Sequence, residues 1–166
     1  SNNNDDQYIE SFVHTPYGIL VTFKDDRSGS NDIYVQLISY SGELLFDAEG
    51  LNIVDAENDQ ESSSVSYSEI ADKALICWDD YRTGEGYDLY CKYINFGITE
   101  SDLSYALSDE IELSGQSNTS GGNQQSSFIY PSQSGSFLIT WEDYRNDIDG
   151  DVYFQEISGY NFRLTN

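Results

Sequence analysis

The chain has no methionine, one histidine, two cysteines, two prolines and only seven basic residues among 166. Thirty acidic residues stand against those seven, so the net charge is −23. Such a chain would repel a phosphate backbone, which excludes nucleic-acid binding, and it is disfavoured on anionic membrane surfaces for the same reason. It also contains no run of 18 apolar residues, so the sequence predicts no membrane insertion.

The missing residue types also argue against some enzyme classes. A thiol enzyme needs a base beside its cysteine, and the single histidine, His14, lies far from both cysteines in the sequence. A pair of acidic residues of the kind that glycosidases use does not indicate an active site here, because many such pairs occur by chance among 30 acidic residues. The absence of Met and the many Ser, Asn, Gly and Asp residues favour a processed or excised piece of a secreted protein.

What the chain does contain favours strands. Hydrophobic residues make up only 38%, but 14 Tyr and 8 Phe supply apolar area for a core. Thr, Tyr, Val and Ile are common and Pro is scarce, a composition that fits strands better than helices. We therefore expect one all-β domain over residues 1–166.

One phrase occurs three times: an aromatic residue, then Asp two positions later and Arg four positions later, a short polar loop, and Asp-apolar-Tyr. The arginines lie 55 and then 63 positions apart, a period that suits a multi-stranded β unit. The copies are Phe23–Arg27 with Asp32–Tyr34, Trp78–Arg82 with Asp88–Tyr90, and Trp141–Arg145 with Asp151–Tyr153.

Each copy divides into four short predicted strands separated by turn residues. The expected strands are Tyr8–His14, Ile19–Phe23, Ile33–Ile38 and Glu43–Phe46; Ser63–Tyr67, Ala74–Trp78, Leu89–Ile94 and Leu103–Leu113; Ser127–Tyr130, Phe137–Trp141, Val152–Ile157 and Asn161–Leu164. The second strands are almost continuously apolar, which predicts that both of their faces are covered. Three four-stranded antiparallel blades of a β-propeller, over about 1–50, 51–113 and 114–166, satisfy this pattern, either as a half-ring or as a segment of a larger propeller. A β-sandwich is the alternative.

The phrase Trp-x-Asp-x-Arg followed by Asp-Ile-Tyr-x-Gln, with Asp-Gln upstream, resembles the propeller-like repeats of large secreted bacterial surface and adhesion proteins. Many of those proteins carry a type IX secretion sorting tail. The resemblance covers nearly the whole chain, although Phe23 replaces Trp and Lys92 replaces the Gln found at Gln36 and Gln155. It implies a secreted or cell-surface module that is structural or adhesive and not an enzyme. A carbohydrate-binding or glycan-active secreted propeller is the alternative function.

The repeated arginines predict a structural staple in every copy. A planar guanidinium can bridge carboxylates across a tight hairpin and bond loop carbonyls. The expected pairs are Arg27 with Asp32, Arg82 with Asp88, with Asp80 as a further partner, and Arg145 with Asp151.

Asp147, Asp149 and Asp151 form the best local pattern for a cofactor, because three alternating carboxylates can converge on Ca²⁺. The glycine of this loop is misplaced for an EF-type site, and Ser158 stands where the twelfth-position Glu would be. A solvated acidic hairpin tip is therefore the favoured interpretation, and Ca²⁺ the alternative.

Cys77 and Cys91 fall opposite each other on the neighbouring predicted strands of the second copy. Cross-strand spacing of about 4.5–5.5 Å between Cβ atoms is slightly long for a disulfide but can adjust, so a bond and two free thiols both remain open. Thr22 and Thr140 replace Cys77 in the other copies, so the pair is a local addition to the repeat.

Three blades would leave two uncovered apolar faces, which are an association hazard. We therefore expect the partner to be a second copy of the chain, in an oligomer or end-to-end polymer, or adjoining blades of a parent protein.

Overall fold

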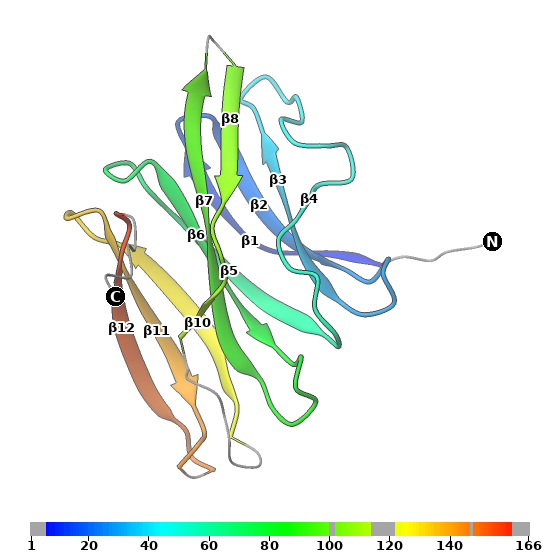
Figure 1. Cartoon of the computed structure of the whole chain (residues 1–166), viewed down its shortest axis with the longest axis vertical. Coiled ribbons are helices and arrows are strands. Elements are labelled where there is room, and N and C mark those ends of the chain that lie inside the picture. The colour runs from blue at the N-terminus through cyan, green and yellow to red at the C-terminus, as the bar shows by residue number, and fades with distance from the viewer. Residues whose placement is uncertain (1–5, 100–101, 114–121, 147, 161–166) are drawn as a thin grey trace.

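The computed structural model describes residues 6–99, 102–113, 122–146 and 148–160. Its regular elements in these ranges are all β-strands, which form three antiparallel sheets, none of them closed on itself. The sheets follow one another across the molecule in chain order (Figure 1). The prediction of an all-β chain is confirmed. In the described part of the chain no helix is long and apolar enough to cross a membrane.

The first sheet has four strands in sequential order: β1 (Gln7–Thr15), β2 (Gly18–Asp25), β3 (Asp32–Ile38) and β4 (Leu51–Asn52). A tight turn joins β1 to β2 and depends on Gly18, whose φ is +148°. A Cβ atom there would lie 2.1 Å from the carbonyl oxygen of Ile38. Glycine is therefore required both by the backbone conformation and by the close approach of β3.

The second and third sheets repeat this plan with different additions. The second contains β5 (Gln60–Ser68), β6 (Lys73–Asp80), β7 (Asp88–Thr99) and β8 (Asp102–Leu107), with β9 (Ile111–Glu112) also paired to β7. The third contains β10 (Gln124–Pro131), β11 (Ser136–Asp143) and β12 (Asp151–Ser158). The extra sequence of the second copy forms the long β7–β8 hairpin, which projects beyond its neighbours (Figure 1).

The predicted fourth strands differ from the structure, so the described sheets are not uniformly four-stranded. Residues 43–46 follow a turn and form a bent segment, in which Leu44 makes an isolated bridge to Ile38, and Leu51–Asn52 pairs with β3 instead. The segment predicted as Leu103–Leu113 is divided into β8 and β9. Asn161–Leu164 lies outside the described residues.

The first three strands of each sheet pair in the same register, which fixes the equivalent positions of the repeats. Each first strand carries an irregularity at the same place, before Ser11, Ser64 and Phe128. After it, Phe12 pairs with Val21, Val65 with Ile76, and Ile129 with Ile139. Residues at equivalent positions therefore point to the same side of their sheets.

Two hydrophobic clusters lie between successive sheets. Ala74, Ile76 and Trp78 of β6 belong to the cluster with the first sheet, whereas Leu75 and Cys77 belong to the cluster with the third. The middle sheet is thus covered on both faces, as its continuous apolar run predicted. The same prediction is wrong for β2 and β11, because the first and third sheets are each covered by a neighbouring sheet on one face only.

A disulfide joins Cys77 and Cys91, which are direct partners in the β6–β7 register with Cα atoms 4.0 Å apart. Both side chains are fully buried in the cluster against the third sheet. The bond therefore ties the two central strands of the middle sheet at the point where that sheet packs against its neighbour.

Candidate functional site

The repeated phrase forms the same loop at the end of the second strand in every sheet. Each second strand ends in a buried aspartate, whose carboxylate accepts a hydrogen bond from the backbone N–H of the arginine two residues later. The distances are 2.9 Å for Arg27 to Asp25, 2.9 Å for Arg82 to Asp80 and 3.0 Å for Arg145 to Asp143. This side-chain-to-backbone bond starts the turn that leads into the third strand.

The guanidinium of each arginine then returns to the same carboxylate. Arg82 Nη2 lies 2.6 Å from Asp80 Oδ2 and Arg82 Nε lies 2.9 Å from Asp80 Oδ1, a two-pronged pair with a fully buried carboxylate. Arg145 makes the same contact with Asp143 at 2.5 Å, and Arg27 pairs likewise with Asp25. Planar guanidinium groups favour this geometry, which lysine could not reproduce.

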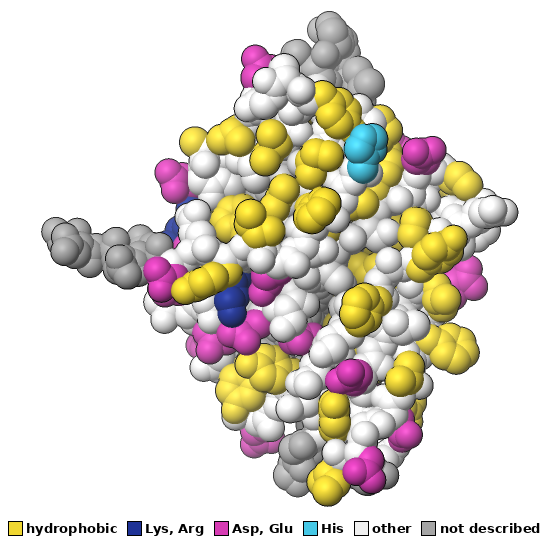
Figure 2. Space-filling view, turned by 180° about the vertical axis from the view of Figure 1, so that it is seen from behind, with side chains coloured by type: hydrophobic (Ala, Val, Ile, Leu, Met, Phe, Trp, Pro, Cys, Tyr) yellow, Lys and Arg dark blue, Asp and Glu magenta, His cyan; other side chains and the backbone are white. Residues whose placement is uncertain are grey.

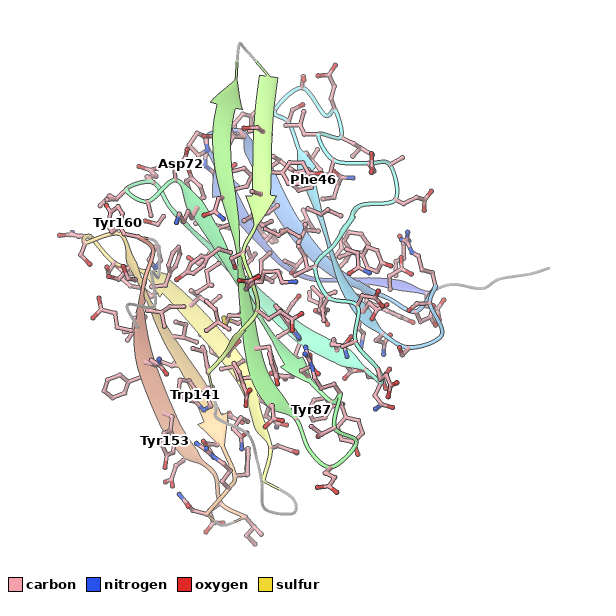
Figure 3. All side chains as sticks on the ribbon, viewed as in Figure 1. Phe46, Asp72, Tyr87, Trp141, Tyr153 and Tyr160 are labelled. Carbon is pink, nitrogen blue, oxygen red and sulfur yellow. A yellow bond between two sulfur atoms is a disulfide. The ribbon has the colours of Figure 1, made fainter. Side chains whose placement is uncertain are left out.

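An aromatic layer completes the loop. The guanidinium carbon of Arg82 lies 4.0 Å from the ring centroid of Tyr90, and Tyr90 in turn stacks on Trp78 at 6.4 Å. The indole N–H of Trp78 donates to Asp80 at 2.8 Å, so four repeated residues form one closed set of contacts. Equivalent stacks join Phe23, Tyr34 and Arg27, and Trp141, Tyr153 and Arg145. Trp141 and Tyr153 are labelled on the third sheet in Figure 3.

The structure pairs the three arginines with Asp25, Asp80 and Asp143. The expected partner Asp80 of Arg82 is confirmed, whereas the expected pairs with Asp32, Asp88 and Asp151 are wrong. Those three aspartates begin the third strands, directly across each hairpin from the arginine-bound carboxylates. Asp32 accepts a hydrogen bond from the Ser28 hydroxyl. The physical reason is the backbone bond that starts the turn, since it holds the earlier carboxylate beside the arginine.

The pKa values follow these contacts. Hydrogen bonds from Arg27 hold the pKa of Asp25 below its ordinary value. Burial acts in the opposite direction on Asp143, but the hydrogen bonds from Arg145 outweigh it and the pKa of Asp143 is also lowered. Burial, with the nearby carboxylates of Asp55 and Asp25, raises the pKa of Asp32. In the first and third loops the arginine therefore favours the ionised form of its carboxylate, Asp25 or Asp143.

The loops also connect one sheet to the next. The backbone N–H of Gln60 donates to the carbonyl of Asn31, and that of Gln124 donates to the carbonyl of Tyr87, both at 2.7 Å. Asn31 and Tyr87 each immediately precede the aspartate that begins a third strand. The upstream Gln of one repeat is thus bonded to the loop of the previous repeat. Tyr87 lies in this loop at one end of the middle sheet (Figure 3).

The proposed calcium ligands are only partly described. Asp147 lies outside the described residues, Asp149 lies in the turn after it, and Asp151 begins β12. Within the described ranges no group of three His, Cys, Asp or Glu side chains is arranged to hold a metal. The Ca²⁺ site therefore stays a prediction.

A hollow of about 510 Å³ lies on the first sheet, on the face turned away from the second sheet. Ile9, Val21, Phe23 and Ile38 are among its apolar lining residues, and Glu49 also contributes to the lining. A lining of this kind suits an apolar side chain better than an ionised small molecule.

No family model, curated protein or solved structure matched the chain when it was compared with each. Its three repeats therefore serve as the reference for one another. The loop residues make structural contacts in every sheet, whereas other repeated positions have environments that change from sheet to sheet.

Proposed function

We propose that the chain is a secreted or cell-surface module with a structural or adhesive role, which binds other proteins through the uncovered faces of its first and third sheets. One observation carries this proposal: both end sheets expose large apolar side chains on the face turned away from the middle sheet. Contiguous exposed apolar residues on a folded protein mark interaction surfaces.

The apolar residues on the outer face of the third sheet are Phe128, Tyr130, Leu138, Val152 and Phe154, and this face also carries Thr140, Glu142 and Glu156. Phe128, Val152 and Phe154 are 74%, 78% and 73% exposed. Phe128 and Phe154 both flank Thr140 through the β10–β11 and β11–β12 pairings, so they lie on one side of the sheet. Three aromatic side chains on one face of the sheet supply the amphipathic contact area that protein interfaces favour.

The apolar side chains on the outer face of the first sheet include Ile9, Phe12, Ile19, Val21, Phe23 and Ile38, and His14, Tyr34 and Gln36 lie on the same face. Ile9 and Phe12 are 75% and 70% exposed, and the hollow lies on this face. Figure 2 shows hydrophobic side chains gathered on this side of the molecule, around the histidine side chain.

The finer fold proposed here is a stack of propeller blades. The first strands β1, β5 and β10 lie next to one another, with β5 contacting both of the others. This convergence supports blades that radiate from a common axis. A plain sandwich has two sheets, whereas here a middle sheet has a neighbouring sheet on each face.

A binding comparison tests the proposed function against the carbohydrate alternative. The immobilised chain is probed with a set of purified extracellular-matrix proteins, with the chain itself, and with a glycan array. We expect protein binding that falls roughly tenfold or more in the Phe12→Asp/Phe154→Asp variant, as for the loss of interface anchors worth about 1.4 kcal/mol. Tyr81→Ala is the control, because Tyr81 lies in the loop after β6, where its ring contacts Tyr87 and not the outer faces.

Glycan binding that depends on Tyr81, and is unchanged by the outer-face variant, would replace this proposal with the carbohydrate alternative. Binding to none of the proteins in the set, the chain included, would contradict it outright.

A further inference from the structure

We infer that the occupant of these faces is a second copy of this chain, docked head to tail, with the outer face of its first sheet on the outer face of the third sheet of its neighbour. This inference rests on the proposed function and names the partner. The three repeats support this inference, because the two interfaces between sheets within the chain show which residues each kind of face contacts.

The outer face of the third sheet has the positions that are buried in the other two sheets. Val152 is equivalent to Ile33 and Leu89, both of which are fully buried against the next sheet. Phe154 is likewise equivalent to Val35 and Cys91, which are also fully buried. The exposed outer face of the third sheet therefore corresponds to the face by which the first sheet contacts the second. It also corresponds to the face by which the second sheet contacts the third.

The outer face of the first sheet is the complementary half. Its Val21 and Phe23 are equivalent to Ile76 and Trp78, which are fully buried against the preceding sheet. In the third sheet, Ile139 and Trp141 occupy these positions in the second cluster. One chain thus carries both halves of its own internal interface, one half exposed at each end.

The backbone supports the same arrangement. In both internal interfaces, the N–H of the upstream Gln bonds the carbonyl of the residue before the third-strand aspartate. The equivalent carbonyl of the third sheet is that of Gly150, and the equivalent amide of the first sheet is that of Gln7. A docked copy would therefore join Gln7 N–H to Gly150 O, as Gln60 joins Asn31 and Gln124 joins Tyr87.

One polar contact of the interface between the second and third sheets also has a counterpart in the proposed docking. Asp79 of the middle sheet accepts a hydrogen bond from the backbone N–H of Ser126, at the irregularity of β10, at 3.1 Å. Glu142 occupies the position of Asp79, and Ile9 occupies that of Ser126, although Ile9 pairs with Phe23 and does not share the positive φ of Ser126. Docking would bring the Glu142 carboxylate close to the irregularity of β1, where backbone N–H groups can donate to it.

Such an interface is heterologous, because two different faces meet. It produces a closed ring if the rotation between copies closes, and an open filament if it does not. A self-complementary dimer would instead join two identical faces. A mixing experiment separates these cases.

The experiment uses sedimentation velocity on the wild type, Phe12→Asp and Phe154→Asp, each alone and over a dilution series, and on a 1:1 mixture of the two variants. Both side chains are largely exposed, so neither change disturbs the core, and circular dichroism checks the fold. Ile70→Asp is the control, because it makes the same chemical change at an exposed position in the β5–β6 turn.

We expect the wild type and Ile70→Asp to associate with rising concentration, and each outer-face variant to weaken association roughly tenfold or more. The mixture should regain a complex of two chains, because each variant keeps the face that the other lacks, and this complex should not grow further. A wild type that stays monomeric at its highest soluble concentration would overturn the inference. So would a variant that alone associates as strongly as the wild type, or a mixture that stays monomeric. Binding to another protein in the set used above would then leave the proposed function standing with a different partner.

Discussion

Among single residues, the buried carboxylates of the arginine loops depend on their arginine partners for the stability of the fold. Arg82→Ala would leave the fully buried Asp80 without its guanidinium. Removing one partner of a buried ion pair typically costs about 3–5 kcal/mol, so we expect the free energy of unfolding to fall by about 3 kcal/mol. Urea denaturation measures this change.

The control for that prediction is Lys24→Ala. Lys24 forms an ion pair with Glu61 at 3.4 Å, and both side chains are partly exposed, so its loss should cost at most about 1 kcal/mol. Equal small losses for Arg82→Ala and Lys24→Ala would show that the repeated arginines are not structural.

Asp79 should make stability depend on pH. Burial between the second and third sheets, with the charges of Glu10 and Glu61 as a smaller cause, raises the pKa of Asp79 from 3.8 to about 7. The folded state thus holds a proton that the unfolded state has lost. The associated stabilisation is complete below the unfolded pKa and is lost as the pH rises toward 7, by up to roughly 4 kcal/mol.

Asp79→Asn should remove this dependence, because the amide oxygen can still accept from Ser126 N–H and carries no charge. We expect the variant to be more stable than the wild type at pH 8, with the advantage shrinking toward pH 5. Urea denaturation at both values measures the difference, and parallel pH profiles for the two proteins would contradict the raised pKa.

Among the strands and loops, the disulfide is the clearest local addition. Cys77→Thr/Cys91→Val installs the residues that the first sheet has at the equivalent positions, Thr22 and Val35. The bond closes a loop with a sequence separation of 14, for which chain entropy gives a stabilisation of about 3 kcal/mol. We expect the variant to lose roughly that much, and a reductant to lower the denaturation midpoint of the wild type only. A reductant that leaves the wild type unchanged would argue against the bond.

The sequence predicted the first three strands of each sheet well, because alternating or continuous apolar residues end at clear turns. It failed at Glu43–Phe46, whose apolar residues suggest a strand. There the Leu45 N–H donates to the Leu37 carbonyl, and the Glu43 N–H donates to the Ser39 hydroxyl. These two bonds close a turn where a strand was expected. The carboxylate bound by each arginine was also not determined by spacing, because two aspartates flank every loop. Only the backbone bond to the first of them decides between the two.

In the whole molecule, the order of the sheets decides which equivalent residues are buried. With a net charge of −23, the protein repels itself, and the apolar contacts between sheets must outweigh that repulsion. Three repeats of the same design stack so that the middle sheet is covered on both faces, whereas the first and third sheets each leave one face open.

The most direct test uses one residue type at one repeat position. Leu20, Leu75 and Leu138 are equivalent, and they are 0%, 0% and 36% exposed. Urea denaturation of dilute protein should show that Leu20→Ala and Leu75→Ala each cost about 2–5 kcal/mol, whereas Leu138→Ala costs less than about 1 kcal/mol. A loss for Leu138→Ala as large as that for Leu20→Ala, or a loss for Leu75→Ala as small as that for Leu138→Ala, would contradict this order of sheets.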